Sequence, residues 1–328
     1  MAALRKRSRH KHRPLAVIKM TQQQIIEWLL EGDVSIQYQV WRDLLGVDKK
    51  KLQTRIANEG WGTNILSKRN SDGHWGERFY QPKWISTHYT LLDLRNLNLP
   101  SNNTIVQETI ELVLQKNKAD DGGIQLGPST SQHSDVCVNG MFLNYAAYFK
   151  TSENKLQSII DSILAEIMPD GGFNCRTTRS GAKHSSLHTT ISVLEGLTEF
   201  QKVGYTYRKD EILRAKKSSI EFILLHQLFL SDRTGQIINK DFLKLTYPCR
   251  WKYDILRAMD FFQYAGIEWD KRMKAAMDVL KTKRNNEGTW NMQAAHSGQV
   301  HVNMEKTGKP SRWNTLRALR VMKHFEIE

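Results

Sequence analysis

Five glycine-containing turns recur along the chain, and this repetition constrains the fold more than any other feature. The turns are SDGHWG at 71–76, DDGGIQ at 120–125, PDGGFN at 169–174, DRTGQI at 232–237 and NEGTWN at 286–291. From Gly73 through Gly122, Gly171 and Gly235 to Gly288, successive central glycines are 49, 49, 64 and 53 residues apart. Glycine adopts the positive φ that tight turns require. A period of this length predicts a repeat architecture.

The segments between the turns alternate between amphipathic and more apolar, as helix pairs do. NTIVQETIELVLQKN (103–117) has apolar residues at helical spacing, whereas GMFLNYAAYF (140–149) is apolar almost throughout. We expect outer helices near 21–31, 51–69, 104–117, 153–168, 208–230 and 270–284. We expect inner helices near 34–46, 85–97, 136–149, 187–202, 251–265 and 313–325. Six stacked pairs predict an all-α fold, a closed α/α toroid (an α6/α6 barrel); the alternative is an open solenoid with shorter units.

Composition limits the classes of protein that this chain can belong to. Its 328 residues are 40% hydrophobic and include nine tryptophans, which is typical of a globular protein. We expect a single toroid domain at 20–328, preceded by a basic extension at 1–19. The first 20 residues hold seven Lys and Arg and no acid, so only +7 of the net charge of +14 belongs to the rest of the chain. That remaining charge is weak evidence for a nucleic-acid partner, and we do not expect one. Three cysteines favour a reducing, cytoplasmic location, and no apolar run is long enough to span a membrane.

Three expected inner-helix starts share a Pro, a cation and a Trp. They are QPKW at 81–84, YPCRW at 247–251 and KPSRW at 309–313, which supply the candidate residues Lys83, Trp84, Arg250, Trp251, Arg312 and Trp313. Proline is favourable before a helix, but a cation there opposes the helix dipole unless an anion is also present. One interpretation is a mouth that binds an anionic or apolar substrate between the Trp rings. The other is that the Trp side chains pack between helices while the cations extend into solvent.

Two of the turns resemble those of a known family. WGTNILSKRNSDGHWG (61–76) resembles the QW-type repeat of squalene cyclases, and PDGGFNCR (169–176) resembles the Gly-Gly-Phe turn of protein prenyltransferase β subunits. The resemblance extends as a repeat pattern over 20–328 and implies the α/α toroid of terpenoid cyclases and prenyltransferases. Activity does not follow from such a fold alone.

The same resemblance implies a zinc site. DGGIQLGPSTSQHSDVCVNGM (121–141) resembles the zinc-binding segment of prenyltransferase β subunits, and the implied ligands are Asp135, Cys137 and His188. Zn²⁺ accepts carboxylate, thiolate and imidazole, and three protein ligands leave a position for substrate or water. The residues His133, Cys175 and His184 are candidates for supporting positions around the ion. The alternative is a helix cap at Asp135, a buried thiol and a core histidine.

The sequence also departs from that family. STSQHS (129–134) carries no cation before the Asp-x-Cys pair, Val138 replaces a tyrosine, and nothing indicates an interface for an α-subunit partner. NKADDGG (117–123) lacks the first Asp of the Asp-x-Asp-Asp motif, which argues against acid-initiated cyclisation. Because the implied zinc ligands are nevertheless present, we expect a zinc-dependent, transferase-like enzyme. It would hold an apolar or anionic small molecule, such as an isoprenoid, in a central cavity.

Two further functions stay open at this point. One is a non-catalytic binding or scaffold protein on the same fold. The other is a carbohydrate-active α/α-toroid enzyme, because a Trp-lined mouth also suits sugar rings. Its catalytic residues are not distinguished by sequence, although Tyr89, Tyr253 and His88 are available.

Overall fold

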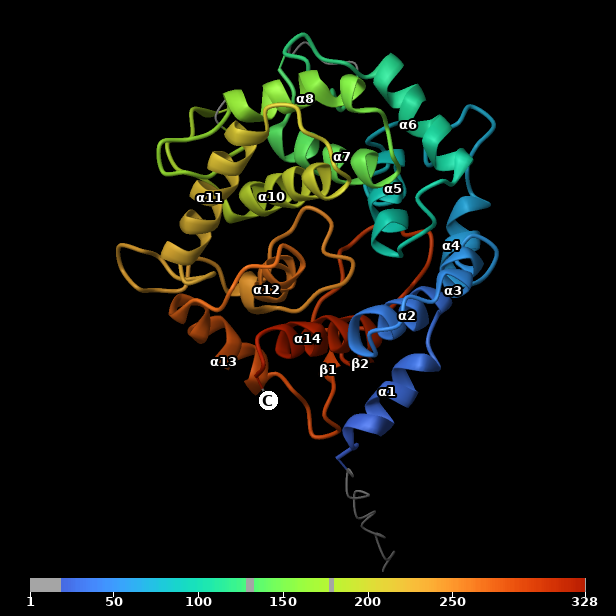
Figure 1. Ribbon diagram of the computed structural model, residues 1–328, viewed down its shortest axis with the longest axis vertical. Helices are drawn as coiled ribbons and strands as arrows, with labels where there is room; N and C mark the ends of the chain where they lie inside the picture. Colours follow the sequence, from blue (N-terminus) through green and yellow to red (C-terminus); the bar gives the residue numbers. More distant parts are fainter. Residues whose placement is uncertain (1–18, 128–132, 177–179, 328) are drawn as a thin grey trace, which may run out of the picture.

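The computed structural model describes residues 19–127, 133–176 and 180–327. Its helices form two concentric layers (Figure 1). The outer layer contains α1 (Gln22–Leu30), α3 (Lys50–Arg55), α4 (Gly60–Leu66), α6 (Thr104–Lys116), α8 (Glu153–Ala165), α11 (Lys209–Leu225) and α13 (Lys274–Thr282). The inner layer contains α2 (Val34–Gln39), α5 (Thr87–Asn96), α7 (Val136–Tyr148), α10 (Leu187–Lys202), α12 (Ile255–Tyr264) and α14 (Arg312–His324). The predicted all-α fold is confirmed, whereas the predicted extension at 1–19 lies, apart from Lys19, outside the described residues.

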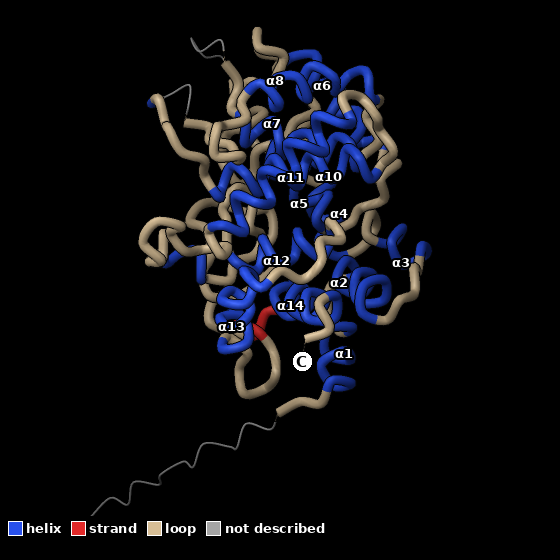
Figure 2. Tube along the Cα trace, turned by 60° about the vertical axis from the view of Figure 1, so that its left-hand side comes forward, coloured by secondary structure: helices blue, strands red, loops and turns tan. Residues whose placement is uncertain are grey.

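Short irregular elements complete the chain between these helices. A π-helical turn at Val40–Leu44 continues α2, and 3₁₀ turns occur at Lys240–Leu243 and Lys271–Met273. Two short antiparallel strands, β1 (Trp290–Asn291) and β2 (Pro310–Ser311), pair beside α14 and are coloured red in Figure 2. They bring the two ends of the 292–309 segment together.

The inner ring closes on itself, which distinguishes a toroid from an open solenoid. The last inner helix, α14, packs against both α12 and α2 (Figure 1). Arg320 of α14 donates to the side chain of Gln39 in α2 at 3.2 Å, and Gln39 donates to the carbonyl of Asn96 at the end of α5 at 3.0 Å. The first and last inner helices are therefore bonded neighbours.

The recurring glycine turn has a repeated set of hydrogen bonds. Gly73, Gly171 and Gly288 have φ values of 87°, 91° and 92°. Two residues after each of them, an aromatic residue donates its backbone N–H to a threonine of the inner helix: Trp75 to Thr87, Phe173 to Thr190 and Trp290 to Thr315, each at 3.0 Å. Each bond satisfies a buried backbone donor. The turn thus fixes where each inner helix lies relative to its outer partner.

Several predicted helix bounds are wrong: the helix predicted at 208–230 ends at Leu225, and two other ranges differ for a clear local reason. The segment 51–69 is two helices because Gly60 has φ +60° and the Asp33 carboxylate accepts the N–H of Trp61 at 2.8 Å, which starts α4 anew. The segment 251–265 becomes helical only at Ile255, because Asp254 is the N-cap and accepts the N–H of Arg257 at 2.8 Å.

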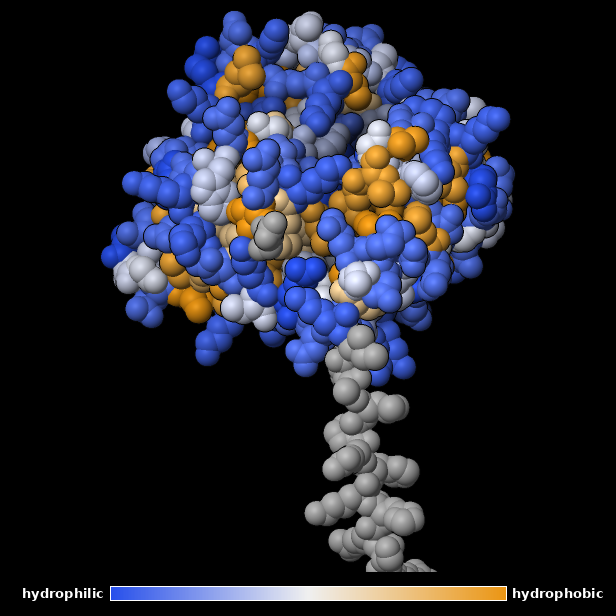
Figure 3. Space-filling model, turned by 60° about the horizontal axis from the view of Figure 1, so that its bottom comes forward, coloured by the Kyte–Doolittle hydropathy of each residue, from blue (hydrophilic) through white to orange (hydrophobic). Residues whose placement is uncertain are grey.

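The most extensive helix contact joins α7 and α10. Gly140 and Gly196 permit this close approach: a Cβ on Gly196 would lie 2.2 Å from the carbonyl oxygen of Gly140. No described helix is both long and apolar enough to cross a bilayer. The face seen in Figure 3 is largely hydrophilic, with apolar side chains gathered in a few separate groups.

Candidate functional site

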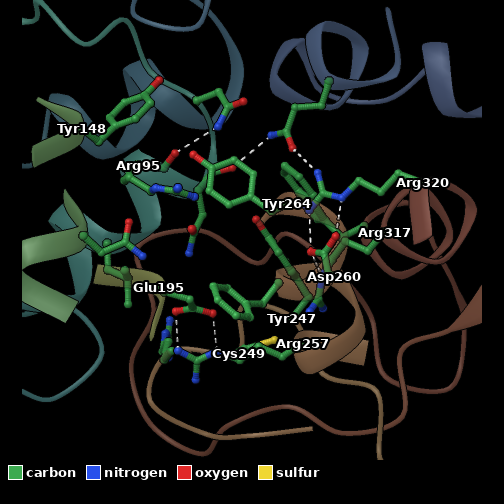
Figure 4. A pocket seen from close by; sticks show the side chains of 18 of the residues that line it. Arg95, Tyr148, Glu195, Tyr247, Cys249, Arg257, Asp260, Tyr264, Arg317 and Arg320 are labelled. Carbon is green, nitrogen blue, oxygen red and sulfur yellow. Dashed lines mark hydrogen bonds and ion pairs between the residues drawn. The ribbon is translucent and has the colours of Figure 1, made fainter. Parts of the chain in front are cut away.

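A polar cavity of about 150 Å³ lies inside the inner ring (Figure 4). Its wall includes residues from all six inner helices and from the 247–250 segment. Six arginines line it: Arg42, Arg95, Arg250, Arg257, Arg317 and Arg320. Three tyrosines, Tyr148, Tyr247 and Tyr264, lie among them. We call this the central cavity.

Carboxylates bind most of these guanidinium groups. Asp260 accepts from Arg320 at 2.5 Å and from Arg317 at 3.1 Å. Burial disfavours its ionised form, but the two arginines outweigh burial and lower the pKa of Asp260. Glu195 accepts from both Nε and Nη2 of Arg257, at 2.8 and 2.7 Å. These ion pairs occupy much of the space inside the inner ring of helices. The central cavity is therefore smaller than the ~300–1,000 Å³ typical of ligand pockets.

A second hollow, of about 430 Å³, opens near the N-terminal ends of the inner helices. It is lined by Pro82, Lys83, Trp84, Trp251, Lys252, Ser297, Gly298 and Gln299, and we call it the N-terminal groove. The Lys83 ammonium lies 5.0 Å from the Trp84 ring centre and 5.2 Å from that of Trp251. Burial first, and then the neighbouring charge of Lys252, lower the pKa of Lys83.

The 292–309 segment contributes Ser297, Gly298 and Gln299 to the groove. Trp84 donates its indole N–H to the carbonyl of Ser297 at 2.5 Å, and Thr90 bonds His301 at 2.9 Å. Glu305 accepts the N–H of Trp313 at 2.9 Å, and burial raises the pKa of Glu305 to about 7. A small cavity of about 100 Å³ beneath this segment shares Arg250 with the central cavity and Gly298 with the groove.

The structure brings together four of the six residues predicted at the mouth. Lys83, Trp84 and Trp251 line the groove, and the Arg250 guanidinium lies 4.6 Å from the Trp84 ring centre. Arg312 lies elsewhere: it donates to the carbonyl of Trp28 at 2.9 Å and lies over that residue's ring.

Trp313 is also away from the groove, stacked on Tyr247 at 4.4 Å in the wall of the central cavity. The three motifs are alike in sequence but not in structure. In KPSRW the helix begins at Arg312, within the motif, whereas the other two motifs end before their helices begin.

Comparison with known proteins supports the fold and corrects the family. No protein-family model matches the sequence, and no curated protein matches it. A solved structure described as a polysaccharide lyase is similar over 92% of this chain and 96% of its own, with a TM-score of 0.50 and 14% sequence identity. The resemblance to prenyltransferases and squalene cyclases is wrong. At this identity the likeness shows the α/α toroid alone.

The residues implied as zinc ligands do not fit a zinc centre. His188 accepts the backbone N–H of Tyr253 on Nδ1 at 2.8 Å, so its neutral ring carries its proton on Nε2 and neither nitrogen offers a free lone pair. Burial first, and then Arg257 and Lys252, lower the pKa of His188 to about 4. Asp135 occupies the N-cap position of α7, and Cys137 lies partly buried in its first turn.

Across the described residues, no group of three or more His, Cys, Asp and Glu side chains is arranged to hold a metal ion. Zinc therefore stays a prediction from the sequence without structural support. The three supporting candidates lie in ordinary surroundings. The Nδ1 of His133 is 3.9 Å from an Asp121 carboxylate oxygen, the Cys175 N–H donates to Thr189 at 3.4 Å, and His184 lines a surface hollow with Asp170 and His226.

The tyrosines and the histidine named for a carbohydrate-active site are all buried. His88 bonds the Tyr145 hydroxyl at 3.2 Å, and Tyr89 bonds that of Tyr80 at 2.8 Å. Tyr253 donates its hydroxyl to the carbonyl of Leu228 at 2.6 Å. Burial lowers the pKa of His88 to about 3, so its ring is neutral at pH 7. These side chains support the wall behind Trp84 and Trp251 and do not line the groove.

Apart from Arg250, the charged residues of the central cavity were missed by sequence reasoning. Arg317 and Arg320 are three positions apart in α14, and Glu195 and Glu199 are four apart in α10. Charges at these spacings fall on one helix face. Charged residues at these spacings, within helices that are otherwise buried, could have predicted a polar interior.

Proposed function

We propose that this chain is a carbohydrate-active enzyme of the α/α-toroid type that binds its sugar chain in the N-terminal groove. The observation that carries the proposal is the pair of indole rings, Trp84 and Trp251, with the Lys83 ammonium about equally distant from both. Indole rings offer broad apolar faces on which sugar rings stack, and ammonium groups donate to hydroxyl and acid oxygens. The similarity to a structure described as a polysaccharide lyase supports this class of ligand.

The charge of the groove favours an acidic sugar. Lys83 and Lys252 both line it, and none of the described residues that line it is acidic. An anionic group between two ammonium groups gains attraction from both, and it relieves their mutual repulsion. The groove, at about 430 Å³, is also larger than the central cavity, at about 150 Å³, and so suits a segment of a polymer better.

Lys83 is the best candidate for moving a proton in this groove. Its pKa is lowered, so more of the neutral amine is present near neutral pH than for an ordinary lysine. His188 and His296 are neutral at pH 7, because burial chiefly lowers the pKa of each to about 4. His188 lies against Trp251, with ring centres 5.1 Å apart, and does not line the groove.

Binding is tested with acidic and neutral oligosaccharides, followed by the change in tryptophan fluorescence. Trp251→Ala should weaken binding about tenfold or more, because a large aromatic anchor typically contributes about 2 kcal/mol. The matched control is Trp269→Ala, since Trp269 is 42% exposed and packs against Phe325 away from the groove. Equal affinity of both variants for every sugar would refute the assignment.

Turnover is tested separately by following new chain ends in the oligosaccharides that bind. Lys83→Met should abolish it, and Lys281→Met, at an exposed position of α13, should not. A second function, non-catalytic sugar binding, is favoured by the arginine–carboxylate pairs that narrow the central cavity. Binding without turnover by the wild-type chain would select that function.

A further inference from the structure

The central cavity holds guanidinium donors that the protein itself leaves unsatisfied. Most of its arginines are well paired: Arg257 donates to Glu195, to Ser192 and to the carbonyl of Lys252. Arg320 likewise donates to Asp260, Asp43 and Gln39. Two others, Arg95 and Arg250, differ from this pattern.

Arg250 is the more unusual of the two. Its side chain is 2% exposed, and its recorded ion pair, from Nη2 to Asp93, is long at 3.6 Å. Its Nε and Nη1 are buried and have no hydrogen-bond partner among the described residues. Arg95 donates to Glu199 through Nη2, but its Nε is likewise buried without a described partner. Both arginines line the central cavity.

Such donors need a ligand. A buried polar group without a partner loses its hydration and gains nothing in return, and this cost is greater for a charged group. In well-determined proteins these groups are satisfied by an ion or an ordered water. Guanidinium forks match the oxygens of phosphate, sulfate and carboxylate groups in particular.

We propose that the central cavity binds one small oxyanion, a phosphate, sulfate or carboxylate group, through Arg250 and Arg95. The cavity of about 150 Å³ exceeds the ~30 Å³ of one liquid water and is too small for a sugar chain. This site is separate from the proposed function, because Lys83, Trp251 and Lys252 line the groove and not the central cavity. Arg250 also lies against Trp84, so a bound anion would help to fix one wall of the groove.

The test is calorimetric titration of the full-length protein with inorganic phosphate, sulfate and glucuronate, each against chloride at matched ionic strength. We expect saturable binding of one anion per chain. Binding of phosphate or sulfate identifies a free ion as the ligand and supports the site. Binding of glucuronate alone identifies the acid group of a sugar and supports the site where Trp251→Ala retains it and Arg250→Gln weakens it. No saturable binding of any of the three would overturn it.

Variants separate this site from general charge effects. Arg250→Gln should weaken binding about tenfold or more, whereas Arg214→Gln, which removes the same charge from the exposed face of α11, should not. The double variant Asp93→Asn with Arg250→Gln removes both members of the buried pair, so it keeps the net charge and avoids an isolated carboxylate. Unchanged anion binding in this folded double variant would overturn the proposal. Trp251→Ala should retain anion binding, so failure of the groove assignment is distinguishable from failure of this one.

Discussion

Replacing Asp260 by asparagine tests the electrostatics of the toroid interior directly. Asp260 accepts from Arg320 through both carboxylate oxygens, at 2.5 Å each, and from Arg317 at 3.1 Å. Its side chain is 12% exposed, and those of Arg317 and Arg320 are 4% and 16% exposed. The asparagine is nearly the same size, so the change removes the charge with little loss of packing. It leaves two buried guanidinium groups without their shared carboxylate.

Breaking a buried pair from one side typically costs ~3–5 kcal/mol, because the remaining charge is buried without compensation. We expect Asp260→Asn to lower the free energy of unfolding at pH 7 by about that amount. The matched control is Asp161→Asn, since Asp161 pairs with Arg208 at 2.7 Å but is 46% exposed. An exposed pair contributes only ~0.2–1 kcal/mol.

Urea unfolding followed by circular dichroism measures both variants. The sign of the pH dependence is a second check: the folded pKa of Asp260 is lowered, so its stabilisation is present above its unfolded pKa of ~3.9 and is lost as pH falls through the folded value. The difference between wild type and Asp260→Asn should therefore shrink in acid. A loss at pH 7 no larger than that of Asp161→Asn would refute the view that the ring interior is shielded from water.

Three further predictions concern packing, acid stability and metal. Gly196→Ala should lower the free energy of unfolding by about 2 kcal/mol, because its Cβ would overlap the Gly140 carbonyl. Overpacking costs up to ~3 kcal/mol, and the higher helix propensity of alanine returns ~1 kcal/mol of that. Urea unfolding that shows no loss of stability would contradict the prediction. The free energy of unfolding should fall as pH drops from ~6.5 towards 4, because the folded state keeps four buried histidines neutral. Burial lowers the pKa to about 3 for His88 and to about 4 for His188, His296 and His301. An NMR titration that gives His188 a midpoint near 6.5 would contradict this prediction. Chelator treatment should leave the melting temperature unchanged, since the predicted zinc ligands do not fit a metal; a loss of stability that added zinc restores would show the opposite.

The helix pairs were predictable because their signals are local. Gly73, Gly171 and Gly288 mark turns by a backbone requirement that depends on a few neighbouring residues, and the apolar spacing between turns identifies the helices. Six such helix pairs leave few ways to bury every apolar face, so the toroid could be predicted from them. The family could not be predicted in the same way, because a Gly-Gly-aromatic turn indicates the geometry of a repeat and not its chemistry.

The candidate site was only partly predictable because it depends on contacts between distant segments. Lys83 and Trp251 meet across 168 positions of the chain, and their shared Pro-cation-Trp pattern was enough to pair them. The same pattern failed for Arg312, which finds the carbonyl and ring of Trp28 instead. The hydrogen bond from Tyr253 that occupies His188 is likewise invisible in the sequence, since it depends on where residues 65 positions apart are packed.

The most direct test of the central claim is a crystal structure of the full-length protein with an acidic oligosaccharide. We predict a sugar ring stacked on Trp251, with its acid group near Lys83 and Lys252. Sugar bound instead in the surface hollow lined by Asp170 and His184, with the N-terminal groove empty at saturating ligand, would contradict it.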